Sequence, residues 1–426
     1  MKRFLCIMIL PCTIIRAEVR EMTLREAVAR AVSDSPEVVM SRMDLLKSQM
    51  GVKVARDPFV PKVYGGSGAA WTYGYPASIN GNPPSIFEAR TDMSIFNRPQ
   101  SYGVAQARET ARGAEVELSR KQDEIAFRTA SLYLDAQQTM QASEVARRQL
   151  QSLDRVEQNV RARVSEGREL DIQAKRAALN SAKARQRLEV LETDQDAAER
   201  SLAVVLGFGV EDRVRVRGDD RVPASNLPET EEGASDQAIS NSKEIRALES
   251  QIQVKNLEIR GAKSEILPQV GLVAQYSLLA KYNFDQFFTT FQRNNAQLGA
   301  YFVIPLLTGS APKARVSQSE AELAKLRAQM SQVRGRIGLD VRKSFQMMKR
   351  AETARNVARL DLDVARDQLS ILLAQYDEGR VSIADVEQAR VQENEKWISY
   401  YDAQNNAERV KLDVLRQTGT LIASLQ

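Results

Sequence analysis

One order of motifs occurs twice along the 426 residues, and this duplication constrains the fold more than any other feature. The segment Ala31-Val-Ser-Asp-Ser-Pro-Glu37 recurs as Ala238-Ile-Ser-Asn-Ser-Lys-Glu244, at an offset of 207. Further along, Glu166-Gly167-Arg168 recurs as Glu378-Gly379-Arg380, at an offset of 212. The five added residues fall between these matches, where surface loops tolerate insertion. Such self-similarity predicts two copies of one plan.

The duplication sets the expected boundaries along the chain. They are a leader over residues 1–17, a first repeat over 18–207, a linker over 208–234, a second repeat over 235–419 and a tail over 420–426. The start of each repeat predicts one helix, over about residues 23–56 in the first repeat and 235–265 in the second. Each of these helices is expected to end near a proline, because proline cannot continue a helix.

A hairpin follows the first helix in each repeat, over about 63–97 and 270–305. Its strands are about ten residues long, rich in aromatic residues and partly alternating, which is the weak signature of outer-membrane strands. A small soluble hairpin is the alternative. If the membrane interpretation holds, six aromatic residues are candidates for a ring at the membrane interface. They are Trp71, Tyr73, Tyr75, Tyr276, Tyr282 and Tyr301.

The next segments are too long for helices of a globular domain. Residues 100–164 contain no proline, and residues 312–377 contain none after Pro312. At about 1.5 Å per residue each helix would be nearly 100 Å long. Shorter return helices follow Gly167 and Gly379, and their apolar residues have coiled-coil spacing. A free-standing cytoplasmic coiled coil is the alternative, which the leader and the hairpins oppose.

The leader also accounts for the cysteines and for much of the charge. Residues 1–17 have a basic start and an apolar middle, which predicts a secretory signal peptide, with lipidation at Cys12 as the alternative. Cys6 and Cys12 are the only cysteines, so the mature chain would have no thiol. The formal net charge is +5, and Lys2, Arg3 and Arg16 contribute three of these charges. The rest does not favour a nucleic-acid partner, because basic and acidic residues alternate.

The chain contains no histidine. This excludes Ser-His-Asp and Cys-His catalysis, HExxH zinc sites and histidine pH switches. Scattered carboxylates are the only candidate acid-base groups, so we expect no enzyme activity, no metal site and no cofactor.

If the expected strands enter a membrane, the chain must form an oligomer. No segment has 18 consecutive apolar residues, so strands and not helices would cross. Four strands cannot close a barrel, and an open sheet edge in lipid leaves backbone groups unsatisfied. Two copies would give eight strands, and the side chains of an eight-stranded barrel fill its interior. Three copies is therefore the smallest number that leaves a lumen.

Three motifs, in this order and duplicated setting, resemble the TolC family of outer-membrane efflux and secretion proteins. They are Met22-Thr-Leu-Arg-Glu-Ala-Val-Ala-Arg-Ala31, Ile304-Pro-Leu-Leu-Thr-Gly309 and Tyr376-Asp-Glu-Gly-Arg-Val-Ser-Ile-Ala-Asp385. The resemblance implies a mainly α fold with a small transmembrane β part. A homotrimer would build a 12-stranded barrel, from four strands per chain, and a long coiled-coil helical barrel. A mixed collar would come from residues 208–232 and the C-terminal tail.

The resemblance further implies a role in export. The chain would lie in the outer membrane of a Gram-negative bacterium and extend through the periplasm. It would serve as an exit duct for small molecules or polypeptides, in contact with outer-membrane lipid, a periplasmic adaptor (membrane fusion protein) and an inner-membrane transporter. A periplasmic coiled-coil adaptor without a pore is the alternative, although no lipoyl-like run of short strands is found.

Site residues follow from the same resemblance. The family places an aromatic residue three positions before the tip glycine and an acid six positions after it, which here are Tyr376 and Asp385. The next acidic position falls on Gln388, and the first-half counterpart of Asp385 is Gln173, so this tip carries fewer acids than the family pattern. These four residues are the candidate gate, although a solvated carboxylate is the alternative for Asp385. The expected adaptor-contacting turns contain Gly167, Arg168, Gly379 and Arg380.

Overall fold

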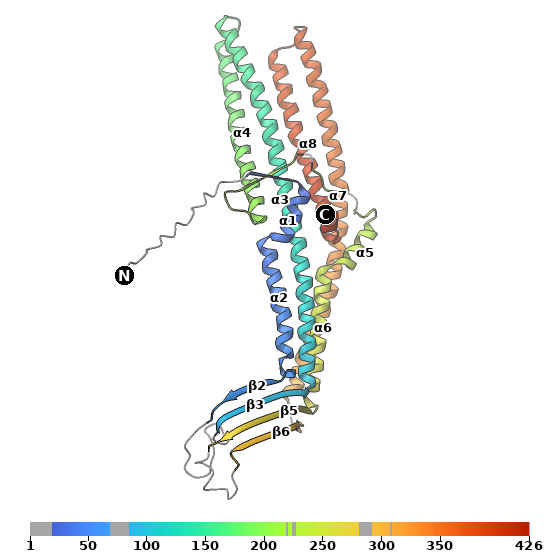
Figure 1. Cartoon of the computed structure of the whole chain (residues 1–426). Helices are drawn as coiled ribbons and strands as arrows, with labels where there is room; N and C mark the ends of the chain where they lie inside the picture. Colours follow the sequence, from blue (N-terminus) through green and yellow to red (C-terminus); the bar gives the residue numbers. More distant parts are fainter. Residues whose placement is uncertain are drawn as a thin grey trace, which may run out of the picture. The chain divides into compact units, whose positions relative to one another are not determined.

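The computed structural model describes residues 19–68, 85–218, 220–223, 227–280, 292–306 and 309–425. It is mainly helical, with one four-stranded and one two-stranded sheet (Figure 1). Among the described residues there are two compact units. The first takes the chain up to Met40, then Arg120–Ser242 and Arg336 onward, and the second takes Ser41–Ser119 and Lys243–Gly335. Each unit therefore draws on both halves of the sequence, and the expected domain boundaries remain a prediction.

The described elements follow the same order in each half. The first half contains β1 (Val19–Met22), α1 (Leu24–Asp34), α2 (Pro36–Arg56), the 3-10 helix η1 (Asp57–Phe59), β2 (Lys62–Gly66), β3 (Ser85–Phe96), α3 (Arg98–Ser165) and α4 (Asp171–Val205). After β4 (Arg213–Val216), the second half contains α5 (Glu231–Asn241), α6 (Lys243–Lys263), η2 (Ser264–Ile266), β5 (Gln269–Leu279), β6 (Asn294–Val303), α7 (Ala311–Asp377), α8 (Ile383–Gln417) and α9 (Leu421–Leu425).

The first helix of each half is interrupted, and here the prediction of one helix was wrong. Ser35 and Ser242 leave the helical conformation, with ψ values of 134° and 115°. In the first half the cause is Pro36, which lacks an N–H and disfavours helical backbone in the residue before it. In the second half Lys243 stands at that position, so proline is not required for the break.

The long helices end as the glycines predict. Gly167, Gly207, Gly379 and Gly419 all have φ between 70° and 79°, a conformation that costs glycine little. The helices α3 and α7 contain 68 and 67 residues, and each return helix contains 35. None of the helices in the described part of the chain is both long and apolar enough to cross a membrane.

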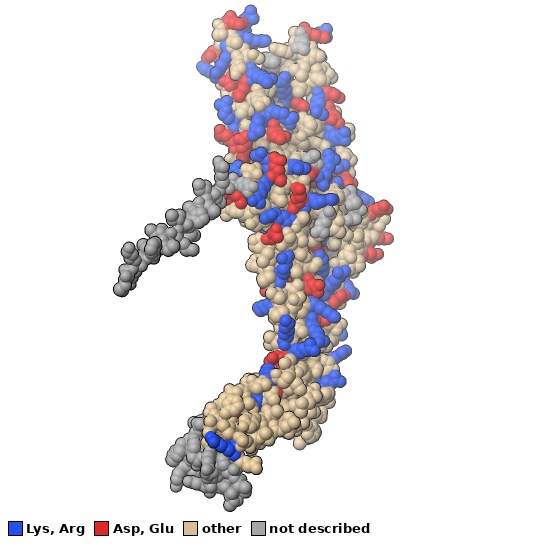
Figure 2. Space-filling model, in the orientation of Figure 1, with Lys and Arg blue, Asp and Glu red and all other residues tan. Residues whose placement is uncertain are grey.

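The helices of the first unit pack in the order α4, α3, α8, α7 (Figure 1). Hydrogen bonds join each neighbouring pair. Ser143 Oγ donates to Gln195 Oε1 between α3 and α4, at 2.8 Å, and Asn405 Nδ2 donates to the Leu134 carbonyl between α8 and α3, at 2.6 Å. Between α7 and α8, Ser344 Oγ donates to Asp413, at 2.7 Å. Charged side chains cover much of the surface seen in Figure 2, as expected of solvated helix faces.

A buried tyrosine binds the linker and the N-terminal strand to α3. The strands β1 and β4 pair in parallel, and Tyr133 lies beneath them with no exposed surface. Its hydroxyl donates to the Asp220 carboxylate, lies 3.1 Å from the Met22 carbonyl and accepts the Arg217 N–H at 3.0 Å. Asp220 also accepts the Leu24 N–H at 2.9 Å. Burial raises the pKa of Tyr133, so this hydroxyl stays protonated.

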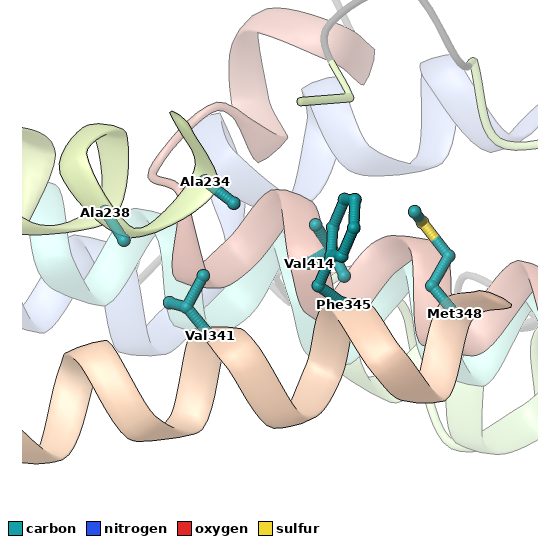
Figure 3. Packing of buried hydrophobic residues seen from close by; sticks show 6 residues of the cluster. All are labelled: Ala234, Ala238, Val341, Phe345, Met348 and Val414. Atoms are coloured by element: carbon teal, nitrogen blue, oxygen red, sulfur yellow. The ribbon is translucent and has the colours of Figure 1, made fainter. Parts of the chain in front are cut away.

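The second-half counterpart of Tyr133 is Phe345, which has no hydroxyl and lies in an apolar cluster. Figure 3 shows this cluster, in which Phe345 and Val341 of α7 pack with Val414 of α8. The remaining members are Ala234, Ala238 and Met348. The two equivalent positions are therefore stabilised differently, one by hydrogen bonds and one by apolar packing.

Candidate functional site at the helical tip

The two turns that were expected to contact an adaptor have the same backbone. The N–H of Gly167 donates to the Val164 carbonyl at 3.0 Å, and the N–H of Gly379 donates to the Tyr376 carbonyl at 2.9 Å. A second bond brings each following arginine back to the last helical turn, which forms a Schellman cap. The side chains of Arg168 and Arg380 are exposed and pair with Glu166 and Glu378. Exposed ion pairs of this kind contribute little to the stability of the fold. A binding partner can therefore replace them at little cost in free energy and contact both arginines.

Tyr376 links the two hairpins of helices near the tip. Its hydroxyl accepts a hydrogen bond from Arg163 Nη2 at 3.2 Å, and the two residues lie 213 positions apart. Arg163 is in the last turn of α3, while Tyr376 is in the last turn of α7. The bond therefore joins the α3/α4 hairpin to the α7/α8 hairpin at a point where both are half-exposed or exposed to solvent.

Asp385 bonds to the start of its own helix. Its carboxylate accepts the backbone N–H of Ser382 at 3.0 Å and the Ser382 hydroxyl at 2.6 Å. The Asp385 N–H in turn lies 3.3 Å from Ser382 Oγ, which completes a capping box at the beginning of α8. These bonds lower the pKa of Asp385 below its ordinary value of 3.8. The carboxylate is therefore charged at neutral pH and already has hydrogen-bond partners.

The other two candidate gate residues, Gln173 and Gln388, line one groove. This groove has a volume of about 710 Å³ and lies among α3, α4 and α8. Glu387 lines it as well, and burial raises the pKa of this carboxyl, while the charge of Arg390 acts in the opposite direction. Arg390 donates to Ser152 Oγ of α3 at 2.6 Å. The structure thus brings Gln173 and Gln388 together, whereas Tyr376 and Asp385 make separate contacts.

The sequence reasoning missed Arg163, Ser382 and Glu387. A signal existed for Ser382, because Ser-x-x-Asp at the start of a helix, here three residues after the turn glycine, is a form of the capping-box pattern. None existed for Arg163, whose partner is distant in sequence, or for Glu387, whose burial depends on packing between helices.

The four-stranded sheet has one polar and one apolar face. Its order is β2-β3-β5-β6, and all neighbouring strands are antiparallel. Because side chains alternate along a strand, the register assigns each residue to a face. Glu88, Arg90, Asp92, Gln275 and Ser277 share one face, and Phe87, Met93, Leu272, Leu278, Leu298 and Phe302 share the other. Such alternation suits a sheet with water on one side and an apolar medium on the other.

Two of the six candidate interface aromatics lie on opposite faces of this sheet. Tyr276 is on the apolar face, where its hydroxyl donates to Asn294 Oδ1 at 3.2 Å. Tyr301 is on the polar face and covers Gly271, since a Cβ at Gly271 would come within 2.6 Å of the Tyr301 ring. The two tyrosines therefore face different surroundings. Trp71, Tyr73, Tyr75 and Tyr282 lie outside the described residues.

Comparison with known proteins identifies the fold and its relatives. The model of the family described as "Outer membrane efflux protein" matches residues 234–425. The outer membrane efflux protein BepC of Brucella suis is 22% identical over 422 residues, which cover 92% of this chain and 87% of BepC. The resemblance to the TolC family is confirmed.

Solved structures agree with this TolC-family fold. The outer membrane protein VceC of Vibrio cholerae matches with a TM-score of 0.72 and 17% identity, over 93% of this chain and 96% of VceC. The Campylobacter jejuni CmeC outer membrane channel matches with a TM-score of 0.74 and 12% identity, over 93% of this chain and 86% of CmeC. At these identities the structural matches establish the fold, and the roles of individual tip residues remain predictions.

The capping box gives a direct test of the role expected for Asp385. If its charge attracts cations, Asp385→Asn reduces cation preference and block by multivalent cations severalfold in bilayer recordings. Ser382→Ala is the matched control, because it removes the cap but keeps the charge, and it should retain both properties. If Ser382→Ala reduced cation preference and block as much as Asp385→Asn does, the effect would come from loss of the cap and not from loss of the charge.

The pH dependence follows from the lowered pKa of Asp385. A carboxylate with a lowered pKa stabilises the fold above its ordinary pKa and loses this contribution as pH falls through the lowered value. That window lies below pH 3.8, so mild acidification leaves Asp385 charged. We therefore expect no change in Asp385-dependent block between neutral and mildly acidic pH.

Proposed function

We propose that this TolC-family chain is an outer-membrane channel-tunnel that exports small molecules or polypeptides and catalyses no reaction. The observation that carries this function is a sheet with one apolar face in a chain whose relatives are outer membrane efflux proteins. The apolar face suits lipid contact, and the polar face suits a water-filled lumen. In this proposal Tyr276 faces the membrane side, whereas Tyr301 faces the lumen.

The channel would be a homotrimer with a shared 12-stranded barrel. In the described sheet β2 and β6 are the outer strands, so each has one unpaired edge. Open edges are unfavourable in lipid, and strands of other copies would satisfy them. The repeated order of helices and strands supports an internal two-fold repeat, in which each copy contributes two equivalent hairpins to the barrel.

The long helices would form a periplasmic tunnel, gated by Tyr376, Asp385, Gln173 and Gln388. The hydrogen bond from Arg163 to Tyr376 supports this gate, because it holds the two hairpins of one copy together. The turns at Gly167 and Gly379, with their replaceable arginine ion pairs, would contact a periplasmic adaptor, which would connect the tunnel to an inner-membrane pump.

The native mass of the protein, extracted from purified outer membranes in mild detergent, tests this function. We expect a trimer in that fraction. Absence from outer membranes would contradict the channel, and a monomer or dimer would contradict the shared barrel. The protein would then fit a periplasmic scaffold without a pore.

A further inference from the structure

The groove that contains Gln173 and Gln388 has a row of basic side chains along one wall. This basic row consists of Arg176, Lys183 and Arg187 of α4, and all three side chains are exposed. Their spacing of seven and four residues puts them on one side of the helix, over about 16 Å of its length. The α4 wall therefore presents an edge of positive charge to the groove.

No residue of the basic row has an ion-pair partner within the described part of the chain. The helix α4 has three other basic residues, and each lies within 3.5 Å of a carboxylate oxygen. These pairs are Lys175 with Asp171, Arg185 with Asp154 and Arg200 with Asp196. None of these three cations lines the groove. The unpaired charges of α4 are therefore the ones that face the groove, where a ligand can reach them.

Two acidic residues also line the groove, and neither forms an ion pair with the basic row. Glu387 of α8 has Arg390 as its partner, at 3.8 Å. Glu169 lies in the turn before α4, seven residues before Arg176. One carboxylate without a cation partner thus stands against three cations without a carboxylate partner, so the groove has an excess of positive charge.

Apolar side chains line the groove beside the basic row. Leu153, Val156 and Val160 lie on one side of α3, since three and four residues separate them, and Val391 belongs to α8. Because α4 and α8 lie on either side of α3 (Figure 1), these side chains are opposite or next to the basic wall. A volume of about 710 Å³ is typical of sites for small organic molecules.

The second half of the chain lacks a basic row. At the offset of 212, Arg176, Lys183 and Arg187 correspond to Gln388, Glu395 and Ser399 of α8. The helix packing that both halves share therefore does not require cations at these positions. The same groove also carries two glutamines where the family pattern has acids, so repulsion of a negatively charged ligand is reduced.

We propose that this groove binds an elongated amphipathic organic anion, with its apolar body against α3 and α8 and its acidic group at the basic row of α4. The inference rests on the proposed function and deepens it, because it names a class of solute that the channel would carry. Burial of the apolar body would supply most of the affinity. The basic row would supply the preference for negative charge.

Energy transfer from tryptophan to a dansyl group measures binding to the full-length protein reconstituted in lipid. The chain has two tryptophans, so Trp71→Phe leaves Trp397 of α8 as the only donor. Trp397 is six residues from Val391 of the groove, or about 9 Å along the helix. The probes are dansyl-labelled undecanoate and its methyl ester, which lacks the charge and keeps the apolar chain. We expect the carboxylate to bind about three- to tenfold more tightly, and high salt to reduce this preference.

Two double variants remove the same residue types from α4 at different faces. Arg176→Gln with Lys183→Gln shortens the basic row and should abolish the preference for the carboxylate. Arg185→Gln with Lys175→Gln is the matched control and should retain it, since both residues lie outside the groove. Asn180 lies between Arg176 and Lys183 on the groove wall. Asn180→Lys should therefore tighten carboxylate binding severalfold, a gain that damage to the fold would not produce.

The outcomes separate this site from the proposed function. A preference for the carboxylate that depends on the basic row supports the site. Equal binding of the two probes, or equal loss of the preference in both double variants, would overturn it. If the protein is a trimer in the outer membrane and shows no preference, the channel stands without this site. A monomer in the native-mass measurement would contradict the shared barrel itself.

Discussion

Replacing Tyr133 with alanine is expected to lower the free energy of unfolding of the first unit by about 3–5 kcal/mol, the usual cost of deleting a buried aromatic ring. The ring is completely buried, and its hydroxyl joins Met22, Arg217 and Asp220. Its loss would leave a cavity and unpaired polar groups on the linker and the N-terminal strand. The measurement is thermal or denaturant unfolding of the detergent-extracted protein by circular dichroism.

Tyr133→Phe separates packing from hydrogen bonding. It keeps the ring, leaves the Arg217 N–H without its acceptor and leaves Asp220 with the Leu24 N–H alone, which costs about 1–3 kcal/mol. A Phe variant as unstable as the Ala variant would show that the hydroxyl network, and not the ring, holds this region. An Ala variant that loses less than about 1 kcal/mol would contradict the structural role of Tyr133 altogether.

The backbone could largely be predicted from the sequence because its signals are local. Two such signals are the glycines at the helix ends and the absence of proline over about 65 residues, and both act within one helix. The structure confirms the long helices and the positions at which they end. The breaks at Ser35 and Ser242 were missed. Pro36 explains only the first of them, and the four-residue strands β1 and β4 are too short for a periodic signal.

The site could be predicted only as a region, because its contacts join distant residues or depend on burial. The tip turns were found from their glycines, whereas the Arg163 partner of Tyr376 comes from another helix 213 positions away. The alternation of polar and apolar residues indicated the hairpin strands. The face of the sheet on which each tyrosine lies depends on the register, which cross-strand pairing decides. Tyr276 and Tyr301 look alike in sequence and lie on opposite faces.

Linking the tips of neighbouring copies is expected to stop export. In the proposed channel the α7/α8 turns of the copies approach one another, and they must separate before a solute passes. Arg380→Cys places a thiol directly after Gly379 and leaves the left-handed glycine itself unchanged. Oxidation or a short bifunctional thiol reagent should then reduce export by about tenfold or more, because a movement that gates a process limits its rate.

Reversibility and matched variants make this result specific. A reductant should restore export in the disulfide-linked protein, and export by Arg380→Ser should be the same with and without these reagents. Arg168→Cys is the counterpart in the first-half turn. If Arg168→Cys links copies without loss of export, the gating movement belongs to the α7/α8 hairpin alone. If linked Arg168→Cys loses as much export as linked Arg380→Cys, both hairpins move. Undiminished export through Arg380→Cys tips that are fully linked would contradict a gate at this turn, because the tunnel would then be open with its tips held together.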